Sequence, residues 1–160
     1  MNTGIEAIAD ILRKAFQVEV DGLTFYTLAA DQATKPASKT LFDRLARDET
    51  EHQAYLRNVM RRYEEHGASS FAMDLREPDL AEFSSAIFTA NFKDQAIGED
   101  FELGALSIGI QLEAIAVEFF DASAHNASDA QISGFYRFLA DWEGHHLRTL
   151  QQLYDNLRED

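Results

Sequence analysis

The stretch RLARDETEHQAYLRNV, from Arg44 to Val59, decides the fold. Its Leu45 and Leu56 recur at the spacing of one helix face, which predicts an amphipathic helix. Two ionisable residues, Glu49 and His52, interrupt that apolar face. Glu-x-x-His places two side chains almost one turn apart on the same side of a helix. The pattern therefore predicts a helix that turns a carboxylate and an imidazole into the core.

Three other segments show the same helical period with ionisable residues on the apolar face. The interrupting residues are Glu19 in the first segment, Glu113 in the third, and Glu143 with His146 in the fourth. We therefore predict an all-α four-helix bundle, with helices at about residues 3–32, 36–66, 101–126 and 129–158. Pro36 suits the first turn of the second helix. Ser128 with Gln131 has the spacing of a capping box before the fourth helix.

The chain also repeats itself after 94 residues. This shift makes three matched pairs of ionisable residues: Glu19 with Glu113, Glu49 with Glu143, and His52 with His146. It predicts two helical hairpins of one design, joined by a long connector at residues 67–100. Because a loop of that length is unusual without structure of its own, we expect a short extra helix in the connector. Residues 1–160 as a whole are expected to form one domain.

Within each hairpin the two glutamates are equally distant from the turn. Glu19 and Glu49 each lie fifteen residues from Thr34, and Glu113 and Glu143 have the same separation from Ser128. At 1.5 Å per residue, each stands about 22 Å from its turn, so antiparallel helices bring the members of a pair to one level.

Four carboxylates in one core would repel one another and take up protons unless cations neutralised them. Two divalent ions would do so, with the two imidazoles as further ligands. Mixed carboxylate and imidazole ligands suit iron or manganese, and zinc would also fit. The small residues Gly22 and Ala116, near the lone glutamates, would leave room for the ions.

Composition narrows the class of protein. A formal net charge of −14 disfavours nucleic acid as a partner. It would either serve solubility, the commoner role of such a charge, or concentrate cations near the chain. The absence of cysteine excludes disulfides, thiolate metal sites and iron–sulfur clusters. No apolar run approaches 18 residues, and the N-terminus lacks a signal-peptide core. We therefore expect no membrane span and a cytoplasmic protein.

Taken together, these residues resemble the rubrerythrin-like branch of the ferritin-like di-iron carboxylate superfamily. Four segments carry the resemblance: EVDGLTFY (19–26), DETEH (48–52), LEAIAVEFF (112–120) and WEGHH (142–146). The resemblance covers nearly the whole chain except the connector, and it implies a ferritin-like bundle with two metal ions, iron above all. The ligands that it implies are Glu19, Glu49, His52, Glu113, Glu143 and His146. The four glutamates are the implied catalytic residues, with Glu49 and either Glu113 or Glu143 as bridges.

The resemblance also implies an activity. Relatives reduce hydrogen peroxide, or oxidise Fe(II) with oxygen or peroxide, at a carboxylate-bridged di-iron centre. This chain has no cysteine to build the rubredoxin module of two-domain relatives, so a peroxidase would need a separate electron donor. The extra glutamate of some peroxidase relatives is also missing one turn from Glu113. The alternatives are a ferritin-type iron-storage protein and a bundle with a structural metal; a homodimer is expected in the leading interpretation.

Two further residues are candidates to support the site. Tyr26 lies two turns from Glu19 on the same face, where it would relay an electron, donate a hydrogen bond near the site, or simply fill the core. Asp48 would either orient a ligand histidine of a neighbouring helix or face solvent. The remaining histidines are predicted to lie at the surface: His66, His125 and His145.

Overall fold

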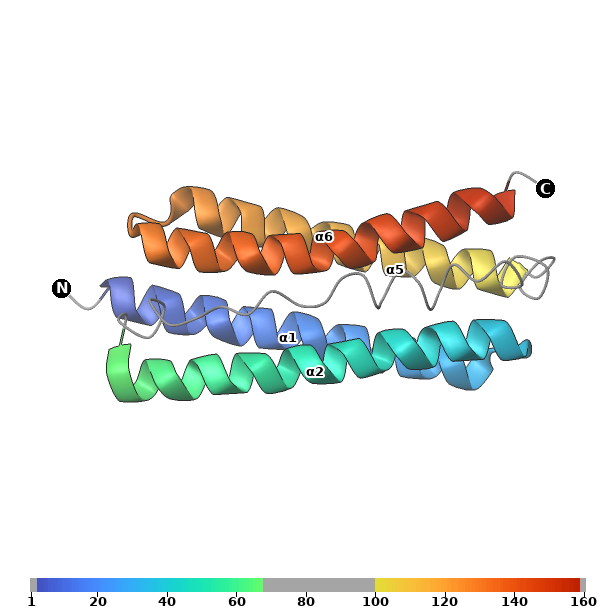
Figure 1. The fold of residues 1–160 in the computed structure, drawn as a ribbon, viewed down its shortest axis with the longest axis horizontal. Helices are drawn as coiled ribbons and strands as arrows, with labels where there is room; N and C mark the ends of the chain where they lie inside the picture. Colours follow the sequence, from blue (N-terminus) through green and yellow to red (C-terminus); the bar gives the residue numbers. More distant parts are fainter. Residues whose placement is uncertain (1–2, 68–99, 159–160) are drawn as a thin grey trace.

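A computed structural model describes residues 3–67 and 100–158, in which four long helices form two antiparallel hairpins (Figure 1). The helices are α1 (Thr3–Gln32), α2 (Pro36–His66), α5 (Asp100–Asn126) and α6 (Ala130–Arg158). α1 packs against α2 and α5 packs against α6, while α1 also contacts α5. The described residues contain no strand, so the predicted all-α bundle is confirmed. The extra helix expected in the connector falls outside the described residues.

The helix ends follow local sequence signals, with one difference from the prediction. α2 begins at Pro36 as predicted, where the missing proline N–H would have no helical acceptor in any case. The capping box predicted for Ser128 is wrong. Asp129 caps α6 instead, because its Oδ1 accepts hydrogen bonds from the backbone N–H groups of Gln131 (2.8 Å) and Ile132 (3.1 Å). A carboxylate satisfies two N–H groups of the first turn and favours the positive end of the helix dipole.

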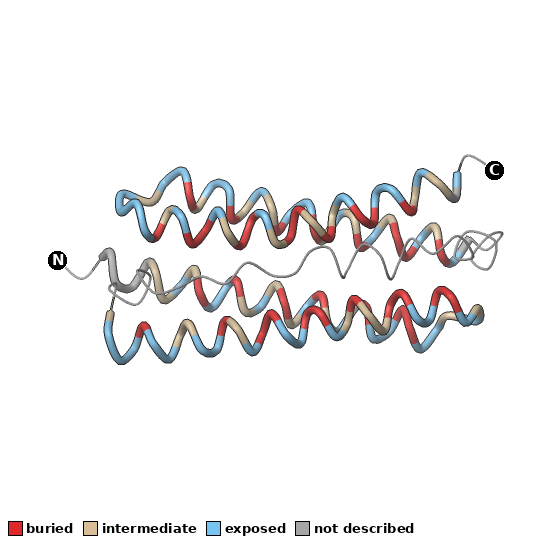
Figure 2. The backbone as a smooth tube through the Cα atoms, in the orientation of Figure 1, coloured by how far each residue is buried: buried red, intermediate tan, exposed pale blue. Residues whose placement is uncertain are grey.

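Each helix buries one face, and these faces meet inside the bundle (Figure 2). The buried apolar residues form two separate clusters. One cluster contains Leu12 of α1, Leu56 of α2, Phe120 of α5 and Leu139 of α6. The other contains Tyr26, Leu45, Leu106 and Leu150 of the same four helices. In every helix the predicted ligands fall between the two clusters, so apolar packing holds the bundle together on both sides of a polar layer.

Apolar side chains are exposed on one face formed by α1 and α5. They are Leu28, Phe101, Ile108 and Ile115. The first three border an apolar groove of about 350 Å³. Among the described helices, only Phe101–Asn126 is long and apolar enough to cross a membrane, a test that the core helix of a water-soluble bundle also passes. The expected homodimer and the expected lack of a membrane span both stay predictions.

Candidate metal centre

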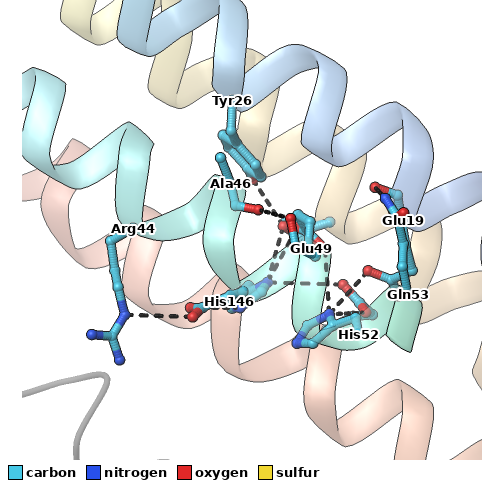
Figure 3. A network of polar contacts seen from close by, with 12 residues as sticks. Glu19, Tyr26, Arg44, Ala46, Glu49, His52, Gln53 and His146 are labelled. Carbon is cyan, nitrogen blue, oxygen red and sulfur yellow. Dashed lines mark hydrogen bonds and ion pairs between the residues drawn. The ribbon is translucent and has the colours of Figure 1, made fainter. Parts of the chain in front are cut away.

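The six residues predicted as ligands lie in one buried layer between the two apolar clusters. None of them is more than 3% exposed. Four offer ligand atoms that all lie within 4.8 Å of one another: Glu49, His52, Glu143 and His146. Figure 3 shows Glu49 in contact with both histidines, and Glu19 in contact with His52. The helical period and the equal distances from the turns therefore predicted correctly that these side chains would meet.

Each lone glutamate contacts the histidine of its own hairpin. Glu19 Oε2 lies 2.9 Å from His52 Nδ1, between α1 and α2. Glu113 Oε1 lies 3.3 Å from His146 Nδ1, between α5 and α6. The layer thus divides into two halves, each made of one glutamate and one histidine.

The other two glutamates contact both halves. Glu49 presents Oε2 to His52 Nδ1 at 3.3 Å and Oε1 to His146 Nδ1 at 3.6 Å. Glu143 presents Oε1 to His52 Nδ1 at 3.5 Å and Oε2 to His146 Nδ1 at 4.0 Å. The resemblance allows Glu113 or Glu143 as a second bridge beside Glu49. Glu143 has the matching geometry because it contacts both histidines, whereas Glu113 contacts the histidine of its own half.

The buried carboxylates are incompletely satisfied by the protein. One oxygen each of Glu19, Glu49 and Glu143 lacks a hydrogen-bond partner among the described residues. Burial of an anionic oxygen without such a partner is strongly unfavourable. Divalent cations held by these oxygens and by the imidazole nitrogens would satisfy them, and this donor set suits iron, manganese or zinc. The residues present therefore fit a dimetal centre.

The pKa values of the metal-free layer also indicate a site that needs cations. Burial, and then the charge of Glu143, raises the pKa of Glu113 to about 7 and that of Glu19 well above its usual value. Burial works to lower the pKa of His52, but hydrogen bonding and the charges of Glu143 and Glu49 raise it to about 10. Burial also works to lower the pKa of His146, yet Glu113 and Asp48 raise it well above its usual value. The layer thus binds protons strongly when no other cation neutralises its carboxylates.

The comparison with known families agrees with this geometry. A family model described as Rubrerythrin matches residues 10–154. The chain belongs to the rubrerythrin family. No curated protein and no solved structure shows a significant match. Family and buried Glu/His group together support a ferritin-like protein with a dimetal site, as the sequence predicted.

One glycine of this rubrerythrin-family chain makes room for a carboxylate. A Cβ at Gly22 of α1 would lie 3.1 Å from both Cδ and Oε1 of Glu49. That separation is shorter than nine in ten real Cβ contacts, so a side chain here would make Glu49 shift by a few tenths of an ångström. Gly22 thus leaves room for the carboxylate of Glu49. That it also leaves room for metal ions stays a prediction.

Gly22→Ala is expected to weaken metal binding while stabilising the metal-free protein. Alanine favours the helix by about 0.5–1 kcal/mol over glycine, but its methyl group displaces Glu49. We expect a loss of roughly tenfold or more in metal affinity, measured by calorimetric titration of the apoprotein. Gly134→Ala in α6 is the matched control, because nothing lies within 4 Å of its added Cβ. Equal metal affinity in the two variants would contradict the role of Gly22.

Two polar residues support the layer from outside the ligand set. Tyr26 Oη donates a hydrogen bond to Glu113 Oε1 at 2.8 Å, and burial raises the pKa of Tyr26 well above its usual value. Asp48 Oδ2 lies 3.5 Å from His146 Nε2, and its Oδ1 lies 3.4 Å from Arg44 Nε. Of the roles that the sequence allowed for Tyr26, the structure therefore shows the hydrogen bond near the site. Asp48 faces a histidine of the other hairpin.

The sequence did not predict every buried polar or aromatic contact of the described helices. The ring of Trp142 lies against His52, with 3.5 Å between ring centroids, and nothing in the period of one helix predicts this contact. Glu102 of α5 is also buried but lies outside the layer, where its Oε1 accepts a hydrogen bond from Ser38 Oγ at 3.2 Å. His66 and His125 are exposed as predicted, but His145 is only half-exposed, and burial lowers its pKa.

Proposed function

We propose that this protein is a non-haem di-iron oxidoreductase that reduces hydrogen peroxide, oxidises Fe(II), or does both. The observation that carries the proposal is the division of one buried layer into two Glu/His halves that share two glutamates. We assign the ligands to the two ions as follows: Glu19 and His52 to one, Glu113 and His146 to the other, and Glu49 and Glu143 to both.

Bound ferrous iron would supply one electron per ion, so that peroxide takes up two electrons and two protons and leaves as two water molecules. The chain's own residues hold the ions and limit the access of water. Apolar clusters close the layer on both sides, and Tyr26 holds the carboxylate of Glu113. With no cysteine in the chain, electrons would return from a separate donor or from further Fe(II).

Stopped-flow mixing tests the proposal. Apoprotein is loaded anaerobically with two Fe(II) per chain and mixed with hydrogen peroxide or with oxygen, while the near-ultraviolet absorbance of ferric iron is followed. Fast oxidation by peroxide with slow oxidation by oxygen supports a peroxidase. Oxygen oxidation that is at least as fast, with continued Fe(II) consumption, supports a ferroxidase, and a cage-sized assembly would then indicate storage. If neither oxidant produces ferric absorbance, the redox function is contradicted.

A further inference from the structure

The two halves of the layer are matched in their ligands but not in the residues behind them. The 94-residue shift carries every proposed ligand onto another of the same type. It carries Asp48, however, onto Trp142, and Tyr26 onto Phe120. Each member of the first pair directly precedes a glutamate that contacts both halves. The repeat therefore shows two positions, beside the side chains of ligands, at which the halves differ in chemistry. A third difference, Gln53 against Leu147, concerns the backbone oxygen of Glu19, which accepts a hydrogen bond from Gln53.

At the first position, one half has a hydrogen-bond acceptor and the other has a ring. Asp48 Oδ2 lies 3.5 Å from Nε2 of His146. The other oxygen, Oδ1, forms an ion pair with Arg44 Nε at 3.4 Å. The equivalent Trp142 packs against the ring of His52 at an interplanar angle of 44°, and Tyr55 packs edge-on against the indole. An indole has an N–H donor and no acceptor.

This difference acts on the imidazole tautomer. In both histidines Nδ1 is the atom that faces the carboxylates. Once the imidazole has lost one proton, as a metal ligand must, an acceptor at Nε2 keeps the remaining proton on that nitrogen and leaves the Nδ1 lone pair directed at the centre of the layer. Asp48 is placed to do this for His146, whereas Trp142 contacts the ring of His52 by packing.

At the second position, the polar partner again falls on the same half. Tyr26 Oη donates a 2.8 Å hydrogen bond to Glu113, the glutamate that contacts His146. The equivalent residue Phe120 is fully buried and has no polar group to offer Glu19. Glu113 thus accepts a hydrogen bond and His146 lies at ion-pair distance from Asp48, so polar side chains orient both ligands.

We propose that the half formed by Glu113 and His146 binds a divalent cation more tightly than the half formed by Glu19 and His52, so that the two ions enter in a fixed order. The inference rests on the proposed dimetal centre. Asp48 is the positioning residue that creates the difference, through its contact with His146. Trp142 occupies the equivalent place in the weaker half.

Calorimetric titration of the full-length apoprotein with Co²⁺, which needs no oxidant to bind, tests the order of filling. The wild-type protein is expected to bind two ions in two resolved steps. Asp48→Ala should weaken the tighter step by roughly 10–100-fold and leave the weaker step unchanged. Asp48→Asn, which keeps an oxygen acceptor and the side-chain volume, should recover most of the loss. Trp142→Phe is the matched control, and it should leave the tighter step unchanged.

Ligand variants assign each step to a half. His52→Ala should retain the tighter step, and His146→Ala should lose it; circular dichroism confirms that each variant is folded. The inference is overturned if Asp48→Ala weakens both steps equally or neither, or if His52→Ala removes the tighter step. A wild-type protein that binds no second ion would instead overturn the dimetal centre itself, so the two failures are distinguishable.

Discussion

Glu49→Gln is expected to abolish tight binding of both metal ions while stabilising the metal-free protein. Each oxygen of Glu49 faces a different histidine, at 3.3 and 3.6 Å, so the substitution removes a ligand from both halves at once. In the metal-free layer, four carboxylates face only two imidazoles. Because glutamine has nearly the same shape without the charge, it relieves repulsion there above about pH 7, where Glu113 is ionised. At such a pH we expect a gain of about 1 kcal/mol or more in the free energy of unfolding.

Thermal unfolding with and without metal measures both effects. Saturating metal at about 100 times its dissociation constant stabilises the wild-type protein by about 2.7 kcal/mol per site. For a domain of this size, about 2–4 °C of melting temperature corresponds to each kcal/mol. The variant should melt above the wild-type apoprotein and should show no such metal-dependent shift.

The control substitution is Glu51→Gln, which removes an exposed charge two residues away on the same helix. It should leave the metal-dependent shift intact and change the melting temperature of the apoprotein little. If Glu49→Gln keeps the full shift, Glu49 is not a shared ligand. If it lowers the stability of the apoprotein, the four carboxylates are better compensated by the imidazoles than their number suggests.

The sequence predicted the helices and the ligand layer because both follow from regularities within a helix. Glu-x-x-His and the apolar stripes share the period of 3.6 residues, and equal distances from Thr34 and Ser128 fixed the height of each glutamate. Contacts between helices carry no such signal. That Trp142 packs on His52 and that Asp48 faces His146 depend on how the two hairpins pack together.

The errors have local physical causes. Ser128 and Asp129 are both good N-cap residues, and the sequence does not decide which one the chain uses. His145 is adjacent to a ligand on α6, and its angular offset of about 100° per residue turns it only partly toward solvent. Which glutamate contacts both histidines also depended on how the helices pack, because Glu113 and Glu143 lie at one level in the bundle and differ only in the helix that carries them.

Metal-free and metal-loaded protein are expected to respond to pH in opposite directions between about pH 6.5 and 9. In this layer the pKa of Glu113 is raised to about 7 and that of His52 to about 10, and the pKa values of Glu19 and His146 are also raised. The folded protein therefore binds these protons more tightly than the unfolded chain. Stability from such groups is present at low pH and is lost as pH rises through the folded pKa, so the free energy of unfolding of the apoprotein should fall.

Bound metal should reverse the dependence of stability on pH, because protons and metal ions compete for the same atoms. Ligands must be deprotonated to bind, so metal affinity, and with it the metal-dependent stabilisation, grows as pH rises. Melting temperatures of the two forms, measured across this range at fixed free metal, should diverge. Glu113→Gln should flatten the part of the apoprotein curve below about pH 7 and leave the part governed by the histidines. An apoprotein that becomes more stable from pH 6.5 to 9 would show that the buried layer does not hold protons in place of cations.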